Sequence, residues 1–142
     1  MGGIIMDCVF CRILNGEIPS YKVYEDENVL AILDISQATK GHTLILAKQH
    51  FKNLYDIDEV LAGKIFKVIP KIANAIKSAF NPIGLNVLIN TEKPLQTVFH
   101  FHIHLIPRYV HDGVEIDFIN NMGNTSKEQY LEAQKAIQDK LK

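Results

Sequence analysis

The sequence lacks the features that would place a chain in a membrane or along nucleic acid. No apolar run approaches the roughly 20 residues that span a bilayer. The charges nearly cancel, because 15 Lys and Arg stand against 16 Asp and Glu for a formal net charge of −1. Broad binding of nucleic acid needs a basic face, whereas a small phosphate site needs only a few donors. We therefore expect neither nucleic-acid nor membrane partners.

A secretion signal and a disulfide framework are also missing. Residues 1–6 contain no basic residue and are too short for a signal peptide. The two cysteines, Cys8 and Cys11, form one Cys-x-x-Cys pair. A structural disulfide is disfavoured in a reducing compartment, and no strand precedes the pair as in a thioredoxin-like redox site. We expect a cytoplasmic protein in which this pair is half of a zinc site, provided that two further ligands exist.

What the sequence does contain is ordinary for one globular domain. Its 142 residues are 47% hydrophobic and 22% charged, which is enough to bury one core. We find no internal repeat, low-complexity tract or domain-scale linker. A single domain over residues 1–142 is therefore expected.

The hydrophobic periodicity predicts an α+β fold with three helices. A short N-terminal helix ends at Asn15-Gly16, and a C-terminal helix is capped from Ser126. One long helix opens on the capping box Asp56-Ile57-Asp58-Glu59, and Pro70 should kink or split it. Consecutive strands without crossover helices favour a mainly antiparallel sheet. Its five strands are expected over residues 21–25, 29–34, 43–47, 84–90 and 98–107.

The last of these strands has the most informative pattern, because imidazole and apolar side chains alternate along it. Alternation with period two is typical of a strand with one buried face and one face in use. Like side chains then stand about 6.5–7 Å apart. The expected core face carries Phe99, Phe101, Ile103 and Leu105, and the opposite face carries His100, His102 and His104.

A lone histidine in a strand is usually a hydrogen-bonded structural residue. Three in register are different, because clustered imidazoles suppress one another's protonation and gain nothing as plain sheet surface. Metal ligation, nucleophilic catalysis and phosphate binding are all consistent with this row.

Residues 100–106 fit the pattern His, apolar, His, apolar, His, apolar, apolar throughout, and in this they resemble the histidine triad (HIT) family of nucleotide hydrolases and transferases. Similar stretches lie at residues 10–19, 34–43, 48–50, 84–90 and 95–98. The resemblance thus covers roughly residues 8–108 and leaves residues 109–142 as a C-terminal helical extension. The chain is most similar to small bacterial Hit proteins of the Hint-like branch.

The resemblance implies a hydrolase that cleaves at the α-phosphate of purine nucleoside phosphoramidates, nucleotidyl conjugates or dinucleoside polyphosphates. In the family the second triad histidine, here His102, attacks phosphorus and forms a covalent nucleotidyl-histidine that water then cleaves. Its other ring nitrogen needs an acceptor, and a backbone carbonyl is expected there. His104 is expected to contact the phosphate and help to protonate the leaving group, and His42 to complete the site.

The resemblance also implies a set of nucleotide-binding residues. Asp34 matches the acidic residue that accepts hydrogen bonds from both ribose hydroxyls. Its alternative role is to form the turn at the end of a strand. Asn90 and Thr97 offer hydrogen bonds to the phosphate, and the backbone around Leu95, Gln96 and Thr97 offers N–H donors. Leu95 replaces a glycine common in the family, which bears on the leaving groups accepted. A mostly apolar slot for the base is expected, although the same residues could simply pack in the core. They are Val9, Phe10, Ile13, Ile32, Leu33 and Ile35.

For the cysteine pair, the resemblance supplies the missing ligands. Some family members hold zinc with such a pair, a histidine near position 50 and the first triad histidine. The expected ligands are Cys8, Cys11, His50 and His100. A closed site with two thiolates is structural and would join the first helix to the sheet. The alternative is that both cysteines are small buried residues and His50 faces solvent.

Two other functions are compatible with the sequence. His102 and His104 could be ligands of a catalytic metal, since His-x-His on a strand also serves such sites, although no Glu follows the triad closely as a further ligand. The chain could also be a nucleotide-binding regulatory protein with vestigial hydrolysis. A homodimer is expected from the family.

Overall fold

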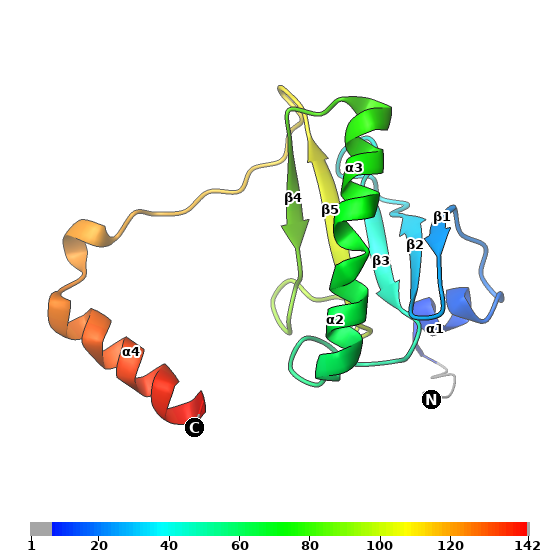
Figure 1. Cartoon of the computed structure of the whole chain (residues 1–142). Helices are drawn as coiled ribbons and strands as arrows, with labels where there is room; N and C mark the ends of the chain where they lie inside the picture. The colour runs from blue at the N-terminus through cyan, green and yellow to red at the C-terminus, as the bar shows by residue number, and fades with distance from the viewer. Residues whose placement is uncertain (1–6, 142) are drawn as a thin grey trace.

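The structure is a computed structural model that describes residues 7–141 (Figure 1). Residues 1–6, where we expect no signal peptide, lie outside the described part. The elements are α1 (Val9–Leu14), β1 (Lys22–Glu25), β2 (Val29–Leu33), β3 (Thr43–Ala47), α2 (Glu59–Lys67), α3 (Ile69–Phe80), β4 (Gly84–Leu88), β5 (His102–Arg108), a 3-10 turn (Met122–Asn124) and α4 (Lys127–Leu141).

The strands form one sheet in the order β1-β2-β3-β5-β4, and every neighbouring pair is antiparallel. The predicted α+β class with a five-stranded antiparallel sheet is confirmed. β3 pairs with β5 so that Leu44 faces His104 and Leu46 faces His102. The two edges of the sheet are β1 and β4.

The central helix is split, as the position of Pro70 predicts. α2 ends at Lys67 with Val68 as its C-cap, and α3 has Pro70 in its first turn, where a missing N–H costs nothing. The predicted start at Asp56 is wrong, since the N-cap is Asp58, whose carboxylate accepts the Leu61 N–H at 2.9 Å. The Asp56 carboxylate instead accepts the N–H groups of Lys52 and Asn53 in the preceding loop.

Alternation along the strands divides the core into two layers. One face of the sheet packs on α2 and α3 through Val29, Ala31, Ile45, Ile103 and Leu105. The other face packs on α1, which brings Phe10, Cys11 and Ile13 against β2 and β3. Because α1 has only six residues, it covers only part of this second face, and a cavity remains between it and β5.

The C-terminal part lies apart from the sheet. After β5 the chain runs in an extended course to α4, which Figure 1 shows well away from the other elements on the β4 side. The predicted Ser126 cap is present, because the Gln129 N–H donates to the Ser126 hydroxyl (3.2 Å) and the Ser126 N–H to the Gln129 side chain (2.7 Å). Among the helices of residues 7–141, none is both long and apolar enough to cross a membrane.

Candidate active site and metal centre

The histidine strand is shorter than its alternation predicts, because β5 begins at His102. Residues 98–101 belong to a loop, in which the Phe101 N–H donates to the Phe51 carbonyl at 2.7 Å. The placement of Phe99 in the core is wrong, since its side chain is 38% exposed. His100 is fully buried and does not share an open face with the other two histidines. The predicted row of three is therefore a row of two, His102 and His104.

Backbone geometry fixes the tautomer of His102. Its Nδ1–H donates to the His100 carbonyl at 2.6 Å, so the lone pair lies on Nε2. The ring of Phe10 packs edge-on against it with centroids 4.9 Å apart. Burial lowers the pKa of His102, because it disfavours the imidazolium. A neutral imidazole with a free Nε2 on a pocket wall is a suitable nucleophile.

A chain of hydrogen bonds fixes the tautomer of His104. The Ala38 N–H donates to Nδ1 of His42 at 3.1 Å, which leaves the proton of neutral His42 on Nε2. That Nε2–H donates to Nδ1 of His104 at 2.9 Å. His104 therefore presents an Nε2–H donor, opposite in character to His102. Burial and the neighbouring imidazoles lower its pKa to about 4, so near pH 7 it donates a hydrogen bond rather than a proton.

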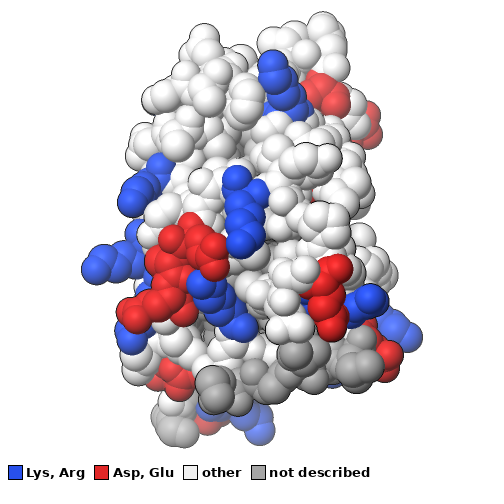
Figure 2. Space-filling model, turned by 90° about the vertical axis from the view of Figure 1, so that its right-hand side faces the viewer, with Lys and Arg blue, Asp and Glu red and all other residues white. Residues whose placement is uncertain are grey.

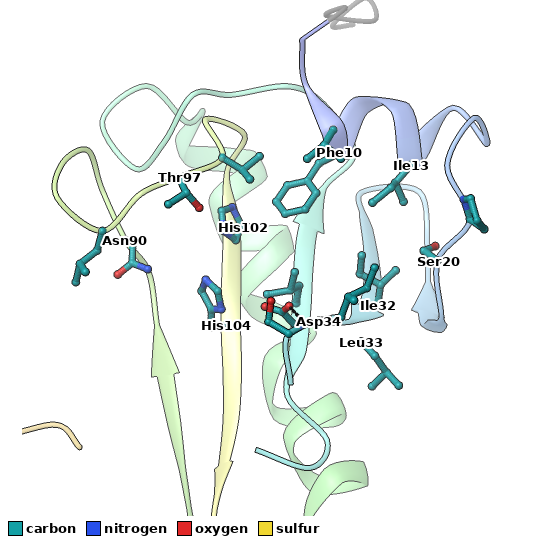
Figure 3. Close-up of a pocket in the computed structure, with 17 residues that line it drawn as sticks. Phe10, Ile13, Ser20, Ile32, Leu33, Asp34, Asn90, Thr97, His102 and His104 are labelled. Carbon is teal, nitrogen blue, oxygen red and sulfur yellow. Dashed lines mark hydrogen bonds between the residues drawn. The ribbon is translucent and has the colours of Figure 1, made fainter. Parts of the chain in front are cut away.

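Asp34 follows β2 and combines two roles. One carboxylate oxygen accepts the Ser36 N–H at 2.8 Å, the contact of a turn former. The other lies 3.5 Å from His42 Nε2. Asp34 also lines the cavity next to His104, as Figure 3 shows. The turn contact orients the carboxylate and leaves acceptor capacity for a ligand.

These groups surround a cavity of about 310 Å³ between α1, β2, β5 and the loop after β4 (Figure 3). Phe10, Ile13 and Ile32 form an apolar side, and Asn90 and Thr97 stand on the other side of the two histidines. Of the predicted nucleotide-binding residues, those that line it are Val9, Phe10, Ile13, Ile32, Leu33, Asp34, Ile35, Asn90, Leu95, Thr97, His102 and His104.

Gln96 is the exception among the predicted nucleotide-binding residues. Its side chain is buried and joins two loops: Oε1 accepts from the Glu92 N–H (2.7 Å) and from Asn53 (3.3 Å), and Nε2 donates to the carbonyls of Lys52 (2.8 Å) and Val98 (3.2 Å). Its backbone N–H also donates internally, to the Glu92 carbonyl. Gln96 therefore shapes the loop that carries Leu95 and Thr97 and has no donor left for a ligand.

Sequence reasoning missed several lining residues, namely Pro19, Ser20, Ser36, Leu44 and Val98. Asn53, buried against Gln96, was also missed. Ser36 and Val98 could have been found as neighbours of Asp34 and Thr97 in the chain. Pro19 and Ser20 carry no such signal, because only the return of the chain from α1 to β1 brings them to the cavity.

The second cluster brings together the four predicted zinc ligands. Nδ1 of His100 lies 3.3 Å from Cys8 Sγ, 3.5 Å from Cys11 Sγ and 3.0 Å from His50 Nδ1. Cys11 Sγ lies 3.3 Å from His50 Nδ1. The four ligand atoms all lie within 4.8 Å of one another. The alternative of isolated buried cysteines with a solvent-facing His50 does not describe this arrangement.

The donor set fits zinc. Two thiolates and two imidazoles are ligands that zinc prefers in tetrahedral structural sites, and here their ligand atoms lie close together. The His100 Nε2–H donates to the Ala47 carbonyl at 2.6 Å, which fixes Nδ1 as the ligand atom. The Cys11 N–H donates to Cys8 Sγ at 3.2 Å and would favour the thiolate. With four protein ligands such a site is closed and structural.

The alternative of a catalytic metal on His102 and His104 is not what the geometry assembles. Within residues 7–141, the second group close enough to hold a metal consists of Asp34, His42 and His104, without His102. The hydrogen bond between His42 and His104 already accounts for the proximity of those two rings.

With an antiparallel α+β sheet and paired histidines beside a mixed polar and apolar cavity, the fold and site define a histidine-triad domain. Residues 15–111 match the family described as HIT domain. The chain therefore belongs to the HIT family of nucleotide-binding, hydrolase-like proteins.

Two curated relatives illustrate the match. "Protein hit" of Bacillus subtilis (strain 168) is 59% identical over 104 residues, 72% of each chain. "Adenylylsulfatase HINT3" of Arabidopsis thaliana is 40% identical over 107 residues, 75% of this chain and 54% of that protein.

Solved structures confirm the fold. A HIT family protein from Bacillus anthracis str. 'Ames Ancestor' superposes with a TM-score of 0.91 at 47% identity, covering 96% of this chain and 99% of that chain. SMU.412c from Streptococcus mutans UA159 gives 0.92 at 46% identity, covering 100% and 90%. A zinc-bound histidine triad family protein from Mycobacterium smegmatis gives 0.72 at 40% identity, covering 80% and 84%.

Proposed function

We propose that this protein hydrolyses nucleotides at the α-phosphate through a covalent nucleotidyl-histidine on His102. The observation that carries the proposal is the pair of opposite tautomers in one cavity. His102 presents a lone pair and His104 presents an N–H, and both line the same space. Displacement at phosphorus needs a nucleophile and a donor for the developing charge in this proximity.

The reaction balances in two displacements. His102 Nε2 forms a bond to phosphorus as the bond to the leaving group breaks, and a phosphoramidate protonated on nitrogen leaves as the neutral amine. Water then attacks phosphorus, the N–P bond breaks and the nucleoside monophosphate is released. His104 Nε2–H, with Thr97 and Asn90, would hydrogen-bond to the phosphoryl oxygens, and His42 positions His104.

The substrates that fit are purine nucleoside phosphoramidates, nucleotidyl conjugates and dinucleoside polyphosphates. A cavity of about 310 Å³ is at the small end of ligand sites and suits one mononucleotide, with the leaving group outside. Leu95, 67% exposed at its rim, would contact that leaving group. The HINT3 relative is named for adenylyl sulfate, which is itself a nucleotidyl conjugate.

Release of adenylate from adenosine 5′-phosphoramidate tests the proposal directly. We expect turnover without added metal, and a nucleotidyl adduct on the peptide that contains His102 when the reaction is quenched during turnover. Binding of adenylate without any turnover would instead support a regulatory nucleotide-binding protein. Adenylate release with no adduct on His102 would contradict the covalent mechanism.

Asp34 provides a test of how the ribose is recognised. Asp34→Asn keeps the shape of the side chain and removes the charge, so it should weaken adenylate binding by about 10- to 100-fold. The same substitution should change binding of 2′,3′-dideoxyadenylate by much less, because that ligand has no hydroxyls to donate. Equal losses for the two ligands in titration calorimetry would rule out this role.

Three further properties of the protein accompany the proposed activity: a bound metal, a surface of mixed charge and association of two copies. The cluster of Cys8, Cys11, His50 and His100 would hold structural zinc, which fits free thiols in a cytoplasmic protein. On the face over β1, Figure 2 shows Lys and Arg interspersed with Asp and Glu and no one-sign patch, as expected for a small-molecule enzyme. We also infer that two copies associate as a homodimer.

A further inference from the structure

The loop between β2 and β3, residues 34–42, carries two of the groups that the proposed reaction uses. Asp34 begins the loop and lines the cavity, and His42 ends the loop and donates to His104 Nδ1 at 2.9 Å. Residues outside helices and strands lack a regular ladder of backbone hydrogen bonds. The positions of both groups therefore depend on hydrogen bonds formed within the loop, and the side chain of Gln37 supplies several of these.

Both N–H groups and the oxygen of the Gln37 side chain are used inside this loop. Its Nε2 donates to the Asp34 carbonyl at 2.7 Å and to the His42 carbonyl at 2.7 Å. Its Oε1 accepts the Gly41 N–H at 3.0 Å. Because an amide nitrogen has two N–H groups, both of its donors are satisfied. A single side chain thus joins the first residue of the loop to the last.

The backbone of Gln37 has a second effect, on the direction of the next N–H group. Its φ is 35°, in the left-handed region that residues other than glycine seldom adopt. In this conformation the Ala38 N–H donates to Nδ1 of His42 at 3.1 Å, so the proton of His42 lies on Nε2 and is donated to His104. A disfavoured backbone conformation persists only where surrounding contacts hold it. The hydrogen bonds of the Gln37 side chain are such contacts.

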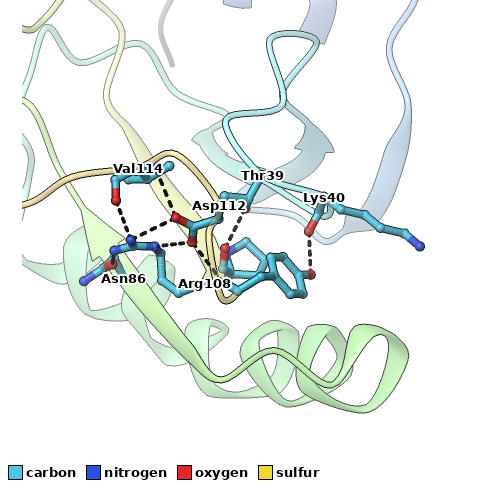
Figure 4. Close-up of polar contacts among 8 residues, drawn as sticks. Thr39, Lys40, Asn86, Arg108, Asp112 and Val114 are labelled. Carbon is cyan, nitrogen blue, oxygen red and sulfur yellow. Dashed lines mark hydrogen bonds and ion pairs between the residues drawn. The ribbon is translucent and has the colours of Figure 1, made fainter.

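The second half of the loop, residues 39–42, is also joined to the end of β5. The Thr39 hydroxyl donates to the Pro107 carbonyl at 2.6 Å, and the Tyr109 hydroxyl donates to the Lys40 carbonyl at 2.7 Å (Figure 4). Neither hydrogen bond involves residues 34–38. The position of this first half relative to His42 therefore depends on contacts within the loop itself.

Three hydrogen bonds join the first half of the loop to His42, from the Asp34 N–H, the Ala38 N–H and the Gln37 side chain. We propose that Gln37 is a positioning residue that sets the tautomers of His42 and His104 and holds Asp34 in place for the ribose. Gln37 does not line the cavity, so it acts through the loop rather than on the substrate. Its effect on turnover rests on the proposed function, whereas the tautomers can be measured in the free protein.

Long-range proton–nitrogen NMR spectra of the histidine rings in the full, ligand-free chain test the tautomers directly. The wild type should show Nε2–H tautomers for His42 and His104 and an Nδ1–H tautomer for His102. Gln37→Asn keeps an amide and tolerates the left-handed backbone, but it is one methylene too short to reach both carbonyls. It should give mixed tautomers at His42 and His104. His102 should stay unchanged, because the His100 carbonyl holds its Nδ1–H.

Gln37→Glu is a second variant of the same size, and it should have the same effect because a carboxylate cannot donate to the two carbonyls. Lys40→Ala is the matched control from the same loop. Lys40 is exposed, and its side chain lies over the Phe80 ring, outside the cavity. Wild-type tautomers at His42 and His104 in either Gln37 variant would overturn the proposal. Changed signals at every histidine would indicate general loss of structure and would overturn it equally.

Turnover separates the role of Gln37 from the proposed function. Both Gln37 variants should lower kcat for adenosine 5′-phosphoramidate about tenfold, as for other groups that orient a functional residue, and Lys40→Ala should keep the wild-type kcat. A wild-type protein without turnover, whose variants still change tautomers as expected, would overturn the proposed function and support the role of Gln37 in the loop. Changed tautomers with wild-type kcat would show that Gln37 does not position groups for the reaction.

Discussion

His102→Ala should lower kcat for adenosine 5′-phosphoramidate by about 10⁴-fold or more, and adenylate binding by less than about tenfold. The first effect is large because no other side chain lining the cavity offers a lone pair oriented by a backbone carbonyl, as His102 does through Nδ1. Loss of a covalent nucleophile removes the route itself. The second effect is small because Asp34, Thr97, Asn90 and His104 would still contact the nucleotide.

Steady-state kinetics and titration calorimetry of the same preparation measure both quantities. His111→Asn is the matched control, since His111 is exposed, lies outside the cavity and has a φ of 58° that asparagine tolerates. The control should retain wild-type kcat. Wild-type turnover by His102→Ala would exclude His102 as the nucleophile. A loss of adenylate binding as large as the loss of kcat would show that His102 acts in nucleotide binding instead.

Cys11→Ser should remove zinc from the protein and lower its stability by about 4 kcal/mol, or roughly 10 °C in the midpoint of thermal unfolding. The magnitude follows from a metal bound to the native chain at free concentrations near 1,000 times its dissociation constant. The cluster links α1, the loop after β3 and the segment before β5. Breaking it detaches three parts of the chain at once.

The zinc prediction extends to activity through the backbone. The His100 side chain is an expected ligand, and its carbonyl holds His102 Nδ1 at 2.6 Å. Loss of the metal should therefore also lower kcat, by roughly 10- to 100-fold, as for other groups that orient a functional residue.

Metal analysis and differential scanning fluorimetry measure these outcomes, with His102→Ala as the control. That control should keep about one zinc per chain and lose turnover, whereas a catalytic metal on His102 would be lost with it. Wild-type protein free of zinc, or Cys11→Ser as stable as wild type, would contradict a structural zinc site.

The fold class and most of the residues that line the cavity could be predicted from the amino-acid sequence alone. The apolar runs of β2 and β3 predicted both strands within one residue, because a strand buried on both faces is apolar along its whole length. The spacing of the histidine motif and the cysteine pair indicated which residues carry chemistry. The motif also suggested a free backbone N–H at Gln96, but that N–H donates to the Glu92 carbonyl, because a motif does not specify the hydrogen bonds within its loop.

How the histidines divide their tasks depends on the tertiary structure. Because β5 begins only at His102, His100 lies in the preceding loop, where it is buried against the cysteines. The alternation of residues along the sequence gives no sign of this start. The tautomers of His102 and His104 are set by the His100 carbonyl and by the Ala38 N–H acting through His42. Those partners are distant in sequence or depend on the shape of a loop. That one imidazole presents a lone pair and its neighbour an N–H therefore follows from packing and hydrogen bonding rather than from residue type.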